Sequence, residues 1–572
     1  MNSIPAPVKK ASIRDYVLAF GLLLLTTVLL YGHTLHVPFY MDDDSGIASN
    51  YLLRDLPATL ATLCTPRGLS KATLALNLYW SGLALPPLHL TNIAIHFCNG
   101  GLVWLLLRRL LAGRWLPLCG ALLFVAHPLQ TQGVTYLIQR ATLLGAFFFF
   151  LALLLYWQAR LVLASGENRR SAAYLRPYLG AVLAAGCALL SKENTATLPL
   201  VLLALDRLLP LPTPRSRRQA FFDYLPFCVL PLLAAVSILF ALTAGAEPRP
   251  LYYPLASLQH NGPLHYLVTQ FSVLWIYLRL LLLPYGQALE HNYPIVADLW
   301  SGQNMLALAG LLALAGLVWR FRRRRPLMAF GAVWMLLALA VESSVIPLDP
   351  LFEHRLYLPM FGFVLLLLDG IPALLGARRA GMVLGIILLI WMPLTWQRNA
   401  LWNDPIAFYE DNLRVVPESE RAMMDLVFRY QDAGRAREME SLLEGAVRLY
   451  PENYEFRTAL ADLYAELGRP EEALRVLDDA IAHMPDNVEL YEMAALIAEH
   501  YQQPARIFTY LNQGMEKVSF GKWRLLNDLG VYHAQQGDLA AAEASYKQSL
   551  ALYAENPAAC QYLAALYYGQ QR

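Results

Sequence analysis

Long apolar runs dominate the first two thirds of the chain. A helix that spans a bilayer needs about 20 mainly apolar residues, and runs near this length recur between Tyr16 and Trp396. The polar residues between them are few and clustered, as in connections at the two faces of a membrane. The pattern predicts membrane-embedded helices at residues 16–31, 90–107, 116–126, 141–163, 174–190, 195–209, 221–243, 266–283, 303–319, 327–346, 356–375 and 380–396.

The pattern changes near residue 398, after which charged and apolar residues alternate at helical spacing. Pro451 and Pro485 lie 34 residues apart, which is the period of tetratricopeptide repeats (TPRs). Leu529 and Gly530 open a later unit in the same phase. The spacing predicts an α-solenoid of about four TPRs, the third of them degenerate. Generic helical hairpins are the alternative.

We therefore predict an all-α protein with two domains, a polytopic helix bundle at residues 1–397 and the repeats at residues 398–572. Composition agrees, because 57% of the 572 residues are hydrophobic and only 15% are charged, whereas soluble proteins carry roughly a quarter charged residues. The net charge of +2 and the scattered basic residues argue against nucleic-acid binding. The six cysteines lack CxxC spacing, so neither a zinc site nor a disulfide framework is indicated.

Basic residues in short loops indicate which loops face the cytoplasm. Six clusters do so: Lys9, Lys10 and Arg14; Arg108, Arg109 and Arg114; Arg169, Arg170 and Arg176; Arg207, Arg215, Arg217 and Arg218; Arg320 and Arg322 to Arg325; Arg378 and Arg379. These clusters alternate strictly with loops that are poor in Lys and Arg, on opposite faces of the membrane, only if residues 266–283 do not cross it. About eleven crossings then remain, with an uncleaved first span, the N-terminus inside and the repeats on the non-cytoplasmic side.

Polar side chains gather in the segments assigned to the outer face. Three consecutive carboxylates, Asp42 to Asp44, follow the first span and suit a base or a cation site. His89 and Asn92 share a helix face, and Arg140 is a natural phosphate partner. The other candidates in these segments are His127, Glu193, Glu342, His354 and Arg355. Helix termination and interhelical hydrogen bonding are the alternative roles.

Several of these segments, in chain order, resemble the integral-membrane glycosyltransferases of the GT-C superfamily, especially the transmembrane-and-TPR O-mannosyltransferases and their bacterial relatives. The matching blocks are Phe39 to Asp43 with Ile47; His89 to Asn92 with His96; His127 to Gln132 with Tyr136, Gln139 and Arg140; Ser191 to Glu193; Glu290 to Pro294; Glu342 to Pro347; Glu353 to Pro359; and Arg398 with Asn399, Trp402 and Asp404. The resemblance departs at Gln132, where the family usually has Glu, and at Glu290 and Asn292, where Asp is common.

The resemblance implies that a sugar moves from a polyprenyl-phosphate-linked donor to an acceptor hydroxyl, in this family that of a protein, at the outer face of the membrane. Asp42 aligns with the first acid of the family pair and would be the base. Asp43 would orient Asp42 or the acceptor. Arg140, His354 and Arg355 would stabilise the leaving phosphate. No cofactor is certain, and a divalent metal is left open.

The expected partners are the lipid-linked sugar, membrane lipid and an acceptor protein that binds in the TPR groove. No N-x-S/T sequon occurs in the outward-facing tail, which favours a bacterial inner membrane with the repeats in the periplasm. Two rival functions remain open. One is a non-catalytic scaffold that presents the repeats to a secretion or assembly complex, and the other is a transporter or flippase for lipid-linked sugars.

Overall fold

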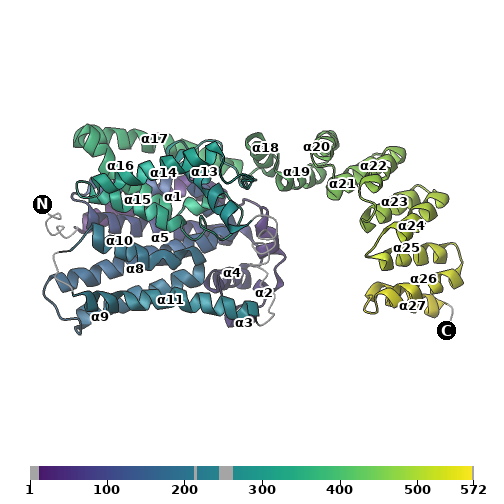
Figure 1. Ribbon diagram of the computed structural model, residues 1–572, viewed down its shortest axis with the longest axis horizontal. Coiled ribbons are helices and arrows are strands. Elements are labelled where there is room, and N and C mark those ends of the chain that lie inside the picture. The colour runs from purple at the N-terminus through teal and green to yellow at the C-terminus, as the bar shows by residue number, and fades with distance from the viewer. Residues whose placement is uncertain (1–11, 212–215, 244–261, 570–572) are drawn as a thin grey trace. The chain divides into compact units, whose positions relative to one another are not determined.

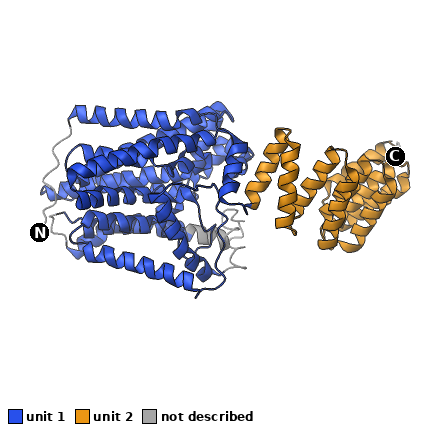
Figure 2. Cartoon of the chain, turned by 90° about the horizontal axis from the view of Figure 1, so that it is seen from above, with its two compact units in different colours: residues 1–419 blue, residues 420–572 orange. Residues whose placement is uncertain are grey.

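A computed structural model describes residues 12–211, 216–243 and 262–569 (Figure 1). The described residues form two compact units, residues 1–419 and 420–572 (Figure 2). Residues 398–419, which the sequence analysis assigned to the repeats, belong to the first unit. There they form the end of α17 (Ala377–Leu401) and the short helix α18 (Pro405–Val415). The predicted domain boundary at residue 398 stays a prediction.

The first unit is a bundle of apolar helices, as the sequence predicts. Among the described residues, eight helices are long and apolar enough to cross a bilayer. They are α1 (Ile13–Tyr31), α5 (Leu85–Leu110), α8 (Arg140–Ala164), α9 (Ala172–Ser191), α11 (Arg217–Thr243), α13 (Pro263–Leu282), α14 (Gly302–Phe321) and α17. Shorter apolar helices are α6 (Trp115–Ala126), α15 (Pro326–Leu339) and α16 (Pro359–Leu375). The chain is therefore an integral membrane protein.

The predicted span at residues 195–209 is shorter in the structure. The 3-10 turn η4 (Glu193–Thr197) precedes an 11-residue helix, α10 (Leu198–Leu208). At about 1.5 Å per residue this helix is about 16 Å long, roughly half the hydrocarbon thickness of about 30 Å. The count of about eleven crossings therefore stays a prediction.

Glycines allow α15 and α16 to approach each other closely. A Cβ atom on Gly331 would lie 2.6 Å from the carbonyl oxygen of Gly362, and one on Gly362 would lie 2.4 Å from that of Gly331. No other residue fits such an approach of two backbones. Trp334 fills the space beside this contact, and its indole N–H donates to the carbonyl of Leu358 at 2.8 Å.

Helix α13 has both ends in contact with segments that the sequence analysis places on the outer face. Near its start, the Tyr266 hydroxyl donates to the carbonyl of Glu342 at 2.7 Å. Near its end, the carbonyl oxygen of Leu281 lies 3.0 Å from His127 Nε2. Because α13 is also one of the eight helices long and apolar enough to cross a bilayer, the expectation that residues 266–283 do not cross the membrane stays a prediction.

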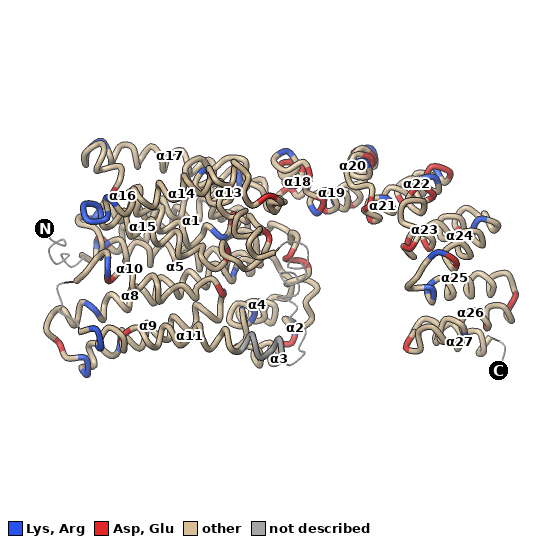
Figure 3. Tube along the Cα trace, viewed as in Figure 1, with Lys and Arg blue, Asp and Glu red and all other residues tan. Residues whose placement is uncertain are grey.

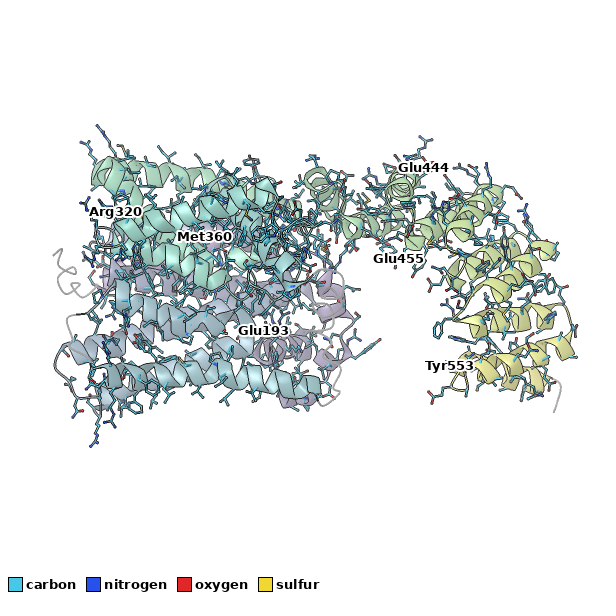
Figure 4. All side chains as sticks on the ribbon, viewed as in Figure 1. Glu193, Arg320, Met360, Glu444, Glu455 and Tyr553 are labelled. Atoms are coloured by element: carbon cyan, nitrogen blue, oxygen red, sulfur yellow. The ribbon has the colours of Figure 1, made fainter. Side chains whose placement is uncertain are left out.

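Charge is distributed unevenly along the bundle. Figure 3 shows Lys and Arg gathered at the left end of the first unit. Arg320 lies at this end, and Glu193 lies well away from it (Figure 4). Short elements, several of which carry the candidate polar side chains, connect the long helices. They are η2 (Asp44–Ala48), α2 (Tyr51–Arg54), α3 (Leu56–Ala61), α4 (Gly68–Ser81), α7 (Gln130–Thr135), η3 (Leu137–Gln139) and η5 (Glu353–Leu356).

The second unit consists of helical hairpins with the TPR period. The first helices of successive hairpins begin at residues 420, 454, 488 and 522, each 34 residues after the last. The helices are α19 (Glu420–Asp432), α20 (Ala436–Leu449), α21 (Tyr454–Glu466), α22 (Pro470–His483), α23 (Val488–His500), α24 (Pro504–Lys517), α25 (Lys522–Gln535), α26 (Leu539–Leu552) and the additional α27 (Pro557–Gly569). The predicted fold class, an all-α membrane bundle with a TPR solenoid, is confirmed.

Candidate functional site

The loop after α1 is fixed by contacts from three distant segments. His89 Nε2 of α5 lies 2.8 Å from the carbonyl oxygen of Val37, and the Tyr40 hydroxyl donates to the carbonyl of Trp402 at 2.6 Å. Met41 has a φ of +42°, a left-handed conformation that is uncommon for residues other than glycine. The backbone just before Asp42 is therefore held in a defined, strained turn.

The two acids of the Asp42–Asp43 pair differ in environment. Asp43 is buried, with 1% of its surface exposed, and its carboxylate accepts the backbone N–H groups of Ile138 at 2.7 Å and Tyr40 at 3.4 Å. Burial raises the pKa of Asp43 to about 8, although these N–H groups act in the opposite direction. Asp42 is exposed, and its backbone N–H donates to the Tyr136 hydroxyl at 2.9 Å. Asp43 thus anchors the loop and Asp42 is presented to solvent.

Arg140, a predicted phosphate partner, is instead packed inside the bundle. It is fully buried, and its guanidinium donates to four neutral oxygens. The acceptors are Asn92 Oδ1 at 2.8 Å, Asn77 Oδ1 at 2.5 Å, and the carbonyls of Leu88 at 2.9 Å and Thr73 at 3.1 Å. Asn92 itself donates to the carbonyls of Val134 and Leu137. These bonds tie α4 and α5 to the start of α8.

His127 and His96 also serve internal contacts. His127 is buried, and its Nδ1 accepts the backbone N–H of Leu129 at 3.1 Å while its other ring nitrogen faces α13. His96 Nδ1 lies 2.7 Å from the Tyr357 hydroxyl. The predicted polar face of α5 thus points into the protein, where each of its side chains contacts another segment.

A second polar cluster surrounds Lys192, which lies between α9 and η4 and is 5% exposed. Its ammonium donates to Thr142 Oγ1 at 2.9 Å and lies 3.4 Å from Glu342 Oε1. Glu342 Oε2 also accepts from Asn194 Nδ2 at 3.3 Å. Burial lowers the pKa of Lys192, and the Glu342 carboxylate opposes this effect.

This cluster connects through a short series of contacts to the loop after α1 that carries Asp42 and Asp43, which we call the acid loop. The Thr142 hydroxyl, which accepts a hydrogen bond from the Lys192 ammonium, donates to Gln139 Oε1 at 2.8 Å. Gln139 directly follows Ile138, the residue whose N–H is bound by Asp43. Displacement of either cluster is therefore expected to reach the other.

Arg355 and His354 of η5 lie beside Lys192. We refer to Lys192, His354 and Arg355 together as the cationic cluster. Arg355 is buried and donates to the carbonyl of Pro350 at 3.2 Å. Burial lowers the pKa of His354 well below its usual value, and the charges of Lys192 and Arg355 lower it further. His354 Nδ1 is buried without a hydrogen-bond partner among the described residues. A neutral histidine with an unpaired, buried ring nitrogen thus lies beside two cations.

Glu193 and Arg67 form an ion pair at the edge of this cluster. Arg67 Nε lies 3.0 Å from Glu193 Oε1, and both side chains are more than a third exposed. Burial of the Glu193 carboxyl acts to raise its pKa, but Arg67 and the neighbouring Lys192 outweigh this and lower it. Glu193 therefore balances the cations at the rim.

The departure at Gln132 has a physical reason. Its Nε2 donates to the carbonyl of Leu289 at 2.9 Å, while its Oε1 accepts the backbone N–H of His354 at 2.5 Å. A carboxylate could not make the first bond, because it has no hydrogen to donate. Gln132 thus joins the loop after α13 to η5.

Glu353 and Asn292 hold the same loop. Glu353 accepts the backbone N–H of Ala288 at 2.8 Å, and its Oε1 lies 2.9 Å from His291 Nε2. Asn292 has a φ of +39°, which asparagine tolerates better than most residues, and it donates to the carbonyl of Glu418 at 2.8 Å. Both Glu353 and Lys192 were quoted in the family motifs but were not among the predicted site residues.

No group of three or more His, Cys, Asp or Glu side chains in the described part of the chain is arranged to hold a metal ion. Asp43 already receives backbone N–H groups on both oxygens. The acid loop, as described, therefore does not fit a metal site.

An apolar groove of about 440 Å³ lies among α10, α13, α14, α15 and α16. Leucines dominate its lining, and Leu312 and Leu336 are more than half exposed. Tyr277 and Leu356 also line it, and Leu356 directly follows Arg355. The groove thus runs up to the cationic cluster.

Comparison with known proteins gives two findings. The Tetratricopeptide repeat family model matches residues 417–497. Relatives named "Protein O-mannosyl-transferase TMTC2" from Mus musculus and Homo sapiens are each 31% identical over 183 residues, covering 29% of this chain and 21% of the relative. The Xenopus laevis protein of that name is 32% identical over 144 residues, covering 23% of this chain and 17% of its own.

The chain spans about a fifth of the length of the curated relatives that it matches. It resembles transmembrane-and-TPR O-mannosyltransferases, in agreement with the motifs in its sequence.

Proposed function

We propose that this protein is a membrane glycosyltransferase that moves a sugar from a polyprenyl-phosphate-linked donor to a hydroxyl group of a protein. The main support is the pairing of an exposed Asp42 with a buried Asp43 on a loop that also contacts, through Gln139 and Thr142, the Lys192 cluster. The names of the relatives support the reaction class. The sugar and the acceptor are left open.

Asp42 acts as the general base in this proposal. An acceptor hydroxyl is a weak nucleophile at neutral pH, and it gains reactivity as a carboxylate removes its proton. The hydroxyl oxygen bonds to the anomeric carbon of the sugar while the bond from that carbon to the phosphate oxygen breaks. The proton goes to Asp42 and the electron pair stays with the lipid phosphate. Asp43 fixes the position of the loop from inside.

Lys192 and Arg355 stabilise the negative charge of the departing phosphate. They replace Arg140 in the role suggested by the sequence, because the Arg140 donors are directed at internal oxygens. Fixed cations in a water-poor site stabilise a developing charge more than mobile ones in water. His354 is neutral and supplies a hydrogen bond through its unoccupied Nδ1.

The prenyl chain lies in the apolar groove among α13, α14 and α15. Its leucine lining matches a hydrocarbon ligand, and its end beside Tyr277 and Leu356 brings the head group near Arg355. The repeats recruit the acceptor on the non-cytoplasmic side. This topology needs an odd number of crossings, which the basic loops of the sequence predict. The named relatives are vertebrate proteins, so a bacterial inner membrane stays a prediction.

Transfer by the purified full chain, with lipid-linked mannose as donor and a protein acceptor, tests the function. We expect Asp42→Asn to lower turnover by about 100- to 10,000-fold while donor binding is retained. Asp44→Asn is the matched control, because Asp44 is exposed on the same loop, and it should change turnover little. Absence of transfer by the unaltered protein, with intact protein binding, would favour the scaffold.

A further inference from the structure

The second unit contains a hollow of about 520 Å³ between α23 and α25, floored by α24. Met493, Leu496 and Val531 provide an apolar part of its lining. Leu496 is 58% exposed, although the neighbouring apolar residues of the same helix are buried. Such an exposed apolar side chain inside a hollow is typical of a binding surface.

Acidic side chains dominate the remaining lining. Glu489, Glu492 and Glu499 of α23 and Asp528 of α25 contribute carboxylates, and Arg524 is the one cation among the lining residues. We refer to this hollow as the acidic groove. Arg524 is already bound, since it lies 3.3 Å from Glu489 Oε1 and also pairs with Glu492.

Among the carboxylates of the acidic groove, those of Glu499 and Asp528 are the least neutralised by a cation. Glu499 accepts from the neutral side chain of Gln535 at 2.8 Å. Asp528 receives no hydrogen bond from any residue that the structure describes, although it is largely shielded from solvent. A carboxylate in such a position is stabilised by an approaching cation.

The pKa of Asp528 agrees with this geometry. Burial, together with the carboxylates of Glu492 and Glu499 on α23, raises the pKa of Asp528 to about 7, and the charge of Arg524 opposes this shift. Tyr546 of α26 also faces Asp528. Close to neutral pH, a bound cation would therefore favour the ionised form of Asp528.

We propose that the acidic groove binds a protein segment in which a lysine or arginine lies beside apolar side chains. The basic group pairs with Glu499 and Asp528, and the apolar groups cover Leu496 and Met493. That this segment belongs to the acceptor rests on the proposed function. Charge complementarity selects the occupant, because an acidic segment would meet like charges and lose affinity.

Binding to the full chain in detergent tests this without any sugar donor. The probes are two fluorescent 15-residue peptides of lysine, leucine and alanine, the second with every lysine replaced by glutamate. Fluorescence anisotropy should give at least tenfold tighter binding of the basic peptide, with a steep loss of affinity at high salt. Equal affinities for the two peptides would overturn the proposal.

Variants locate the binding. Glu499→Gln combined with Asp528→Asn should weaken the basic peptide about tenfold, whereas Glu516→Gln combined with Glu555→Gln, an equal change of charge at exposed positions outside the groove, should not. Equal losses in both double variants would mean nonspecific attraction and would also reject the groove. Asp42→Asn should leave peptide binding unchanged, so a failed transfer reaction and a failed groove are distinguishable.

Discussion

Arg140 provides a direct test of how the bundle uses its charged residues. Replacing it by methionine removes a fully buried guanidinium and its hydrogen bonds to four acceptors: Asn92 Oδ1, Asn77 Oδ1 and the carbonyls of Leu88 and Thr73. Each bond to a charged group contributes roughly 1.5–3 kcal/mol. Relief of the desolvation cost of the guanidinium offsets part of the loss, so we expect a destabilisation of roughly 3–5 kcal/mol.

Thermal unfolding of the full chain, followed by tryptophan fluorescence in detergent, measures this effect. Arg140→Met should lower the midpoint and the yield of monodisperse protein, while transfer per folded molecule stays close to normal. Arg54→Met is the control, since Arg54 is exposed and donates to one acceptor among the described residues, the carbonyl of Ala48; it should cost at most about 1 kcal/mol. An unchanged midpoint together with lost donor binding would refute the structural role and restore Arg140 as a phosphate ligand.

Two further predictions concern topology and pH. A reporter fused after Arg325 should read as cytoplasmic and one after Arg572 as external, and a cytoplasmic reading at the C-terminus would contradict the odd number of crossings. The raised pKa of Asp528 stabilises the folded repeats at pH values below about 4, the usual Asp pKa, and this stabilisation is lost as pH rises through about 7. Asp528→Asn should therefore raise the unfolding midpoint of the repeats at pH 8 but not at pH 4, and equal midpoints at pH 8 would show that Asp528 is not strained by burial.

The sequence predicts the fold well because its apolar runs are long and its repeat spacing is regular. Bilayer-length apolar runs leave few alternatives to a helical bundle, and the repeat starts at residues 420, 454, 488 and 522 follow the 34-residue spacing of Pro451 and Pro485. Helix ends within the bundle are less predictable. Irregular segments such as η4 lie beside polar groups that satisfy their backbone, so hydropathy alone does not locate the end of a helix there.

The site is predicted only in part, because burial decides the role of a polar residue and the sequence does not contain it. Asp42 and Asp43 are adjacent and chemically identical, yet one is exposed and the other is 1% exposed and bound by the Ile138 N–H. A one-residue step along a turn reverses the direction of the side chain. No spacing rule for an irregular loop could assign the two roles.

The contrast between Arg140 and Lys192 shows why charged residues in a membrane bundle need a structure before they are assigned to a ligand. A buried charge must meet partners inside the protein, and Arg140 meets four neutral oxygens that leave its donors occupied. Lys192 instead shares Glu342 with Asn194 and lies beside Arg355 and an unbonded His354 nitrogen. Inside the cluster around Lys192, the cationic groups thus outnumber the carboxylates. A phosphate that enters the cluster would supply the missing negative charge.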